Sequence, residues 1–293
     1  MQKKWKKSVA LVLALMMVFA LGACGGGDDS GNGGDSVDDV MKTAQEALSK
    51  VESMSYEMNM TMNMSAGGQS IESETVGTIQ YISDPLMMSM NMSMDMGVQG
   101  SAEIQMYAEQ SGDEFIMYMS PDGTNWGKQT LLDAEQLEQY NAQDSMNLYL
   151  GSINSFKEVG TEQVNGKDAV KYEGTISNEE LSEVMETAGT ADSLTQLGIT
   201  EDQVVAMYSE LGDLPVQVWI ETESGLPVKY EMDMTDMMQK LMDKVVESMG
   251  EDAAGMTITM DKVFVSMSLS DFNAVSEIVI PEEAKNAQEM TLM

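Results

Sequence analysis

"MSYEMNMTMNMS" at residues 54–65 places methionine or tyrosine at every even position and a polar residue at every odd position. The stretch "LMMSMNMSMDM" at 86–96 repeats this alternation from residue 88 onward. Because side chains alternate along a β-strand, each stretch predicts a long strand with one thioether face and one polar face. A sheet built from such strands is expected to bury one face only and to curl around whatever it covers.

The rest of the chain predicts more strands, separated by turn residues, with helices gathered in blocks. Strands are expected at 54–65, 70–82, 86–97, 102–110, 113–119, 125–130, 156–164, 168–177, 215–222, 226–234 and 256–269, followed by an apolar run at 278–281. Helices are expected after Ser36, at 133–142 and 145–150, from Asn178, from Thr200, and at 235–248. Asn165-Gly166 predicts a primed hairpin turn. The fold class is therefore α+β, a long curved antiparallel sheet with helices packed on its concave face.

The N-terminus carries an export signal. A basic stretch, "MQKKWKK", precedes an apolar run that is too short to span a membrane comfortably and ends in "LGAC" at 21–24. This ending resembles the lipobox of bacterial lipoproteins; the alternative is an ordinary signal peptide followed by a chance cysteine. The resemblance implies cleavage before Cys24 and an S-diacylglyceryl group on its thiol, whose two acyl chains anchor stably in a bilayer. We expect a signal peptide at 1–23, lipidated Cys24 with a flexible acidic, glycine-rich tether at 24–36, and one domain at 37–293.

Composition excludes several functions. The chain has 15 basic residues, all of them lysine, and no histidine, against 49 acidic residues, for a net charge of −34. Removal of 1–23 deletes four lysines and no acids, which takes the charge from −34 to −38. Such a charge repels nucleic acid. Without histidine or arginine, the usual acid–base groups, zinc ligands and phosphate clamps are missing, so we expect no enzymatic activity, no metal and no cofactor beyond the lipid on Cys24.

The methionine rows are the candidate binding residues, and three explanations stay open. They could fill a dry core, line a cavity for an apolar ligand, or bind Cu(I), which accepts thioether ligands. Methionine is flexible and specifies packing poorly, so it suits a cavity whose contents vary. The expected cavity-lining residues are Met58, Met60, Met62, Met64, Met88, Met90, Met92, Met94 and Met96.

The layout resembles the LolA/LolB and LppX/LprG families, and most closely a group of methionine-rich Gram-positive lipoproteins. Three stretches carry the likeness: "AQEALSKVESMSYEMNMTMNMS" (44–65), "DGTNWGKQ" (122–129) and "LPVQVWIETESGLPVKYEMDM" (214–234). The resemblance implies a half-barrel that binds lipid or another apolar molecule in its concavity, with no catalytic residue carried over. The chain departs from the smaller carriers in its length and in its own lipid anchor, which favours local capture over free shuttling.

The sequence therefore predicts a non-enzymatic lipoprotein, anchored on the extracytoplasmic face of the cell membrane at a Gram-positive surface, that binds a lipid or other apolar ligand. The alternatives are a surface structural or interaction module with a dry methionine core, and a Cu(I)-binding lipoprotein. The expected partners are the membrane and an apolar ligand, with no nucleic acid; no protein partner can be named. Trp126, beside a turn, is interpreted as the cap of a core in preference to a stacking platform for a ligand.

Overall fold

The computed structural model describes residues 37–97, 100–112, 114–131, 150–187, 200, 204, 208–248 and 257–289. The expected signal peptide, Cys24, the tether, the helix at 133–142 and most of those at 145–150 and from Thr200 lie outside these residues. Within the described ranges, none of the helices combines the length and the apolar character that crossing a bilayer requires.

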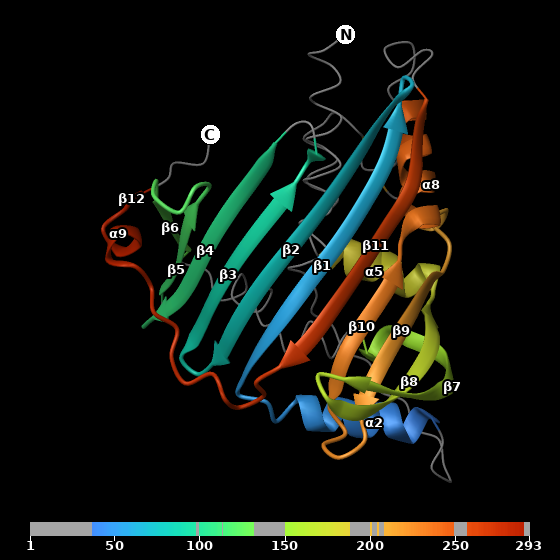
Figure 1. The fold of residues 1–293 in the computed structure, drawn as a ribbon, viewed down its shortest axis with the longest axis horizontal. Helices are drawn as coiled ribbons and strands as arrows, with labels where there is room; N and C mark the ends of the chain where they lie inside the picture. The colour runs from blue at the N-terminus through green and yellow to red at the C-terminus, as the bar shows by residue number, and fades with distance from the viewer. Residues whose placement is uncertain are drawn as a thin grey trace.

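The long alternating stretches form one sheet, as predicted. The twelve strands of the described residues run in the order β12-β6-β5-β4-β3-β2-β1-β11-β10-β9-β8-β7. Neighbouring strands are antiparallel except β12, which pairs in parallel with β6. The strands are β1 (Ser53–Ala66), β2 (Gln69–Ser83), β3 (Leu86–Asp95), β4 (Ser101–Ser111), β5 (Glu114–Ser120), β6 (Gly127–Leu131), β7 (Ile153–Val164), β8 (Lys167–Ile176), β9 (Leu214–Glu221), β10 (Pro227–Asp233), β11 (Ile258–Ser270) and β12 (Gln288–Glu289). The predicted curved antiparallel sheet is confirmed (Figure 1).

Helices pack against one face of this sheet. They are α2 (Val37–Leu48), α5 (Asn178–Thr187) and α8 (Thr235–Ser248), whereas the short α9 (Glu282–Lys285) lies against the opposite face. Buried residues of α2, α5 and α8 belong to the same apolar cluster as the methionines of β1 and β3. We call this helix-covered face, which carries the even-numbered side chains of β1 and β3, the inner face, and the opposite one the outer face.

Helix α8 follows β10 in the chain and packs alongside the part of β11 that β10 does not pair with (Figure 1). Strand β10 pairs with β11 only along residues 264–268. Beyond this point the side-chain amide of Gln239 forms two hydrogen bonds with the β11 backbone. Its oxygen accepts from the Met260 N–H at 2.7 Å, and its nitrogen donates to the Ile258 carbonyl at 3.1 Å. The Thr235 hydroxyl accepts from the Val263 N–H at 2.9 Å. These bonds hold α8 over the inner face.

Local turn chemistry sets the pairing of the strands. Asn165 and Gly166 have φ angles of 53° and 79°, so the predicted hairpin between β7 and β8 turns through two residues with positive φ, as a primed turn requires. At the start of α5, the Ser177 hydroxyl accepts from the Glu180 N–H at 3.3 Å, and the Glu180 carboxylate accepts from the Ser177 N–H at 3.1 Å. This reciprocal pair is a capping box with Ser177 as the N-cap, and α5 begins at Asn178 as predicted.

Part of the outer face is covered by the chain after β11. This differs from the expectation of a sheet that is covered on one side only. After β11 the chain runs past the ends of β1, β2 and β3 to α9 and β12 (Figure 1). Residues 278–281, expected as an apolar run after the last long strand, form no strand; Ile280 instead packs with Ala284 and Tyr118 against the outer face of β5. Trp126 packs on this second cluster and contacts Tyr107 with ring centroids 5.7 Å apart, in agreement with its interpretation as a core cap.

Candidate functional site

The two methionine rows lie on the same inner face, on either side of β2. Met58 of β1 is paired with Gly77 of β2, and Gly77 is paired with Met92 of β3. Residues directly opposite each other in an antiparallel pair point to the same side of the sheet. The rows therefore face one compartment, although 23 residues lie between Met64 and Met88 in the sequence.

Most of the nine predicted residues are buried. Met60 and Met96 are half-buried, and the exposed fractions of the others lie between 1% for Met64 and 9% for Met92. The buried ones are Met58, Met62, Met64, Met88, Met90, Met92 and Met94. Their burial agrees with both a dry core and a closed ligand site, because either arrangement removes the thioethers from water.

Strand β2 adds a narrow strip of small side chains between the two rows, which sequence reasoning missed. Ser73 and Thr75 are 6% and 7% exposed, so two hydroxyl residues are buried on an otherwise apolar face. At Gly77, an added Cβ would lie 3.3 Å from Cγ of Met92 and 3.6 Å from Cε of Met58. The flanking thioethers thus lie beside three consecutive inner-face positions of β2 that carry little side-chain volume, whereas Ile71, Ile79 and Tyr81 fill the two ends of that strand. The signal was present in the small residues at alternate positions of 73–77.

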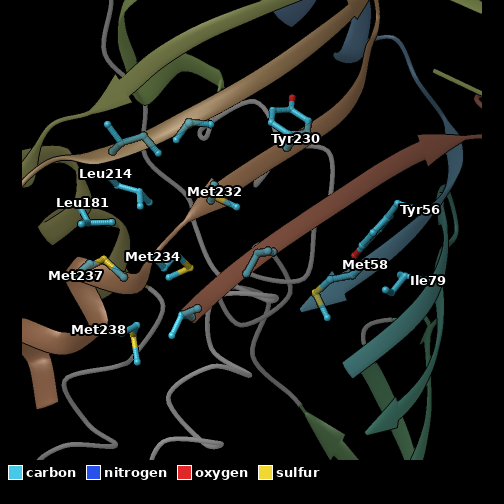
Figure 2. Packing of buried hydrophobic residues seen from close by; sticks show 14 of the residues in the cluster. Tyr56, Met58, Ile79, Leu181, Leu214, Tyr230, Met232, Met234, Met237 and Met238 are labelled. Carbon is cyan, nitrogen blue, oxygen red and sulfur yellow. The ribbon is translucent and has the colours of Figure 1, made fainter. Parts of the chain in front are cut away.

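Methionines from the helices extend the same surface. Met41 of α2 and Met237, Met238 and Met242 of α8 are each at most 4% exposed within the same cluster. Figure 2 shows Met234, Met237 and Met238 near the start of α8, with Met232 on the adjoining β10. The inner face is therefore lined from two directions by flexible, polarizable side chains, which can adapt to contents of different shape.

One row of thioethers runs from β3 across β4 to β5, which is separated from the edge of the sheet by β6 and β12. Met90 of β3 is paired with Met106 of β4, and Met106 is paired with Met119 of β5. Their exposed fractions rise outward, from 2% to 8% to 37%. Apolar surface on the inner face thus reaches solvent at β5.

The inner face also holds neutral tyrosines. Burial raises the pKa of Tyr230, and burial together with the neighbouring Tyr81 raises the pKa of Tyr56. Both phenols stay protonated at any physiological pH and are able to donate a hydrogen bond. Among the described residues, no group of three or more acidic, histidine or cysteine side chains is placed to hold a metal ion.

The fold and the apolar inner face define a class of protein with an open, curved antiparallel sheet and helices packed against one apolar side of it. A family model described as "Family of unknown function (DUF6612)" matches residues 36–289. The chain therefore belongs to this family.

Two solved structures are similar to this chain at low sequence identity. LprF from Mycobacterium bovis is 14% identical, with a TM-score of 0.47 over 87% of this chain and 100% of that one. The lipoprotein LppX from Mycobacterium tuberculosis is 12% identical, with a TM-score of 0.42 over 84% of this chain and 100% of that one. A comparison with curated proteins finds no match. These similarities do not identify a ligand for this chain.

Proposed function

We propose that this protein is a membrane-anchored, extracytoplasmic and non-enzymatic lipoprotein that binds a lipid or another apolar molecule against its inner face. The anchor is the S-diacylglyceryl group expected on Cys24. The ligand-binding surface consists of the two methionine rows and the small residues of β2 between them.

One observation carries this proposal: long, flexible thioethers flank the three small residues Ser73, Thr75 and Gly77 of β2 in the middle of a helix-covered face. A core selected for stability alone would favour valine, isoleucine or phenylalanine in strands, because these side chains specify one packing. Holding a methionine side chain in place costs about 1.5–2 kcal/mol of rotamer freedom. That cost is reduced where the side chains stay mobile around a guest, and methionine-rich surfaces bind varied apolar partners for this reason.

The proposed mechanism is passive burial. An apolar ligand enters where the inner face reaches solvent near Met119, and the thioethers rearrange around it. Retention by a lipid anchor suits local capture and hand-off. Binding by burial needs no catalytic group, in keeping with a chain that has neither histidine nor arginine.

Native mass spectrometry of the full-length protein, purified from its own host, tests the proposal. Co-purifying mass in the range of a lipid, and saturable uptake of a fluorescent fatty acid by the stripped protein, are the expected results. A clean ligand-free mass together with no uptake would favour the dry-core module. Binding of Cu(I) at micromolar concentration or tighter under reducing conditions would favour the metal-binding alternative.

A further inference from the structure

The inner face contains a buried hydroxyl to which no described residue is hydrogen-bonded. Tyr230 of β10 is 2% exposed, and its Oη has no hydrogen-bond partner among the described residues. Buried polar groups are nearly always paired, since an unpaired one loses its bonds to water and gains nothing in return. An orphaned phenol in the interior therefore needs a physical reason.

The position of Tyr230 connects it with the proposed site. Tyr230 is paired with Met267 of β11, and Met267 is paired with Met58 of β1. Met58, Gly77 and Met92 continue the same transverse row across the inner face. At about 4.8 Å between neighbouring strands, about 10 Å separates β10 from β1 and about 19 Å separates it from β3. A chain-shaped ligand lying across the strands would span this distance.

The surroundings of Tyr230 favour a neutral partner. Its paired residues on either side, Val218 and Met267, are apolar. In Figure 2 the ring of Tyr230 stands on β10 with its hydroxyl directed away from the side chains of Met232 and Met58. A hydrogen bond in such a low-dielectric setting is stronger than in water, whereas a buried ion would need a countercharge. A carbonyl oxygen satisfies the phenol without bringing a charge into the core.

Another buried tyrosine shows the contrast. Tyr118, on the outer face, is 3% exposed, and its hydroxyl donates to the Glu109 carboxylate at 2.7 Å. The phenol of Tyr118 therefore has a partner within the protein, whereas that of Tyr230 has none among the described residues.

We propose that Tyr230 is the polar anchor of the binding site, and that its hydroxyl donates a hydrogen bond to the carbonyl oxygen of an acyl lipid whose chain lies across the methionine rows. This inference rests on the proposed function and narrows it. The ligand is an acyl ester or a fatty acid, and an oxygen-free hydrocarbon of the same length binds less well.

A matched pair of probes tests the inference: the methyl ester of a pyrene-labelled fatty acid, and a pyrene-labelled alkane of the same length. Each is titrated into the full-length wild-type protein, into Tyr230→Phe and into Tyr118→Phe. We expect Tyr230→Phe to weaken binding of the ester about three- to tenfold, the usual effect of one lost hydrogen bond, and to leave the alkane unchanged. Tyr118→Phe is the matched control, because it removes a hydroxyl from the outer face and should change neither affinity.

Two further readouts separate anchoring from a structural role. The carbonyl stretching frequency of an isotope-labelled ester should be lower in the wild type than in Tyr230→Phe. Without probe, the urea midpoint of Tyr230→Phe should equal or exceed that of the wild type, since no internal bond is lost, while that of Tyr118→Phe should fall.

The outcomes also separate this inference from the proposed function. If the wild type binds neither probe, the proposed function fails and the inference fails with it. If both probes bind and Tyr230→Phe affects them equally, or affects neither, or loses stability as Tyr118→Phe does, the anchor assignment alone is overturned.

Discussion

Gly77 offers a sharp test of whether the inner face can open, because it lies between the two methionine rows. A Cβ at this position would meet Cγ of Met92 at 3.3 Å and Cε of Met58 at 3.6 Å. These contacts, and a third with Cδ1 of Ile79 at 3.6 Å, are with side chains and not with backbone. We therefore consider Gly77→Val, which places two methyl groups in this space.

The magnitude follows from two opposing effects. Glycine within a strand is less stable than alanine by about 0.5–1 kcal/mol, so any strand glycine gains about this much when a side chain is added without strain. Overpacking a filled core costs about 1–3 kcal/mol. If the thioethers can swing into open space, Gly77→Val should change the free energy of unfolding by less than about 1 kcal/mol. If the face is packed solid, the net loss should reach about 2 kcal/mol.

Urea denaturation of the lipid-stripped protein measures the free energy of unfolding. Titration with a fluorescent fatty acid measures the affinity for an apolar ligand. Gly160→Val is the matched control, since Gly160 lies in strand β7 and an added Cβ there meets nothing within 4 Å. We expect near-wild-type stability for both variants and an affinity at least several-fold weaker only in Gly77→Val. A loss of 2 kcal/mol or more at Gly77 with unchanged affinity would refute the open inner face.

Three further predictions concern other parts of the fold. Gln239→Ala should lower the free energy of unfolding by about 1–3 kcal/mol in urea titrations, because the Met260 N–H loses its buried partner on α8; a loss below about 0.5 kcal/mol would contradict that role. Burial opposes ionisation of Glu221, but the Lys167 ammonium at 2.8 Å and a serine hydroxyl outweigh it and hold the pKa of Glu221 below its ordinary value of 4.5. Its stabilising effect should be present above about pH 4.5 and lost as the pH falls, so the stability difference between wild type and Glu221→Gln should shrink in acid, and a difference independent of pH would count against the ion pair. Met119→Lys should slow uptake of a fluorescent fatty acid in stopped-flow mixing with little change in equilibrium affinity, whereas unchanged kinetics would place the entry elsewhere.

Local patterns in the sequence predicted much of the fold. Alternation in 54–65 and 86–96 indicated the strand lengths and the buried side, because side-chain direction on a strand has a period of two. The Asn165-Gly166 pair indicated the hairpin between β7 and β8, since few other residues accept two successive positive φ angles. The same alternation indicated which methionines share one face of each strand, while their role in binding stays a prediction.

Other features depended on contacts between distant parts of the chain. No local signal shows that residues 278–281 leave the sheet and cover the outer face of β5, because an apolar run suits a buried strand and a buried loop equally well. Tyr230 was noted only as part of a strand pattern, and neither its isolation nor its alignment with Met58 can be predicted without the register of β10, β11 and β1.

The sequence by itself determined which side of each long strand is apolar and where the chain turns, since these depend on neighbouring residues alone. Only the tertiary structure decided that both methionine rows share one compartment and that the small residues of β2 lie between them. It also decided that the phenol of Tyr230 in that compartment has no partner in the described part of the chain. Those relations are set by strand order and register, which arise from pairings between segments far apart in the chain.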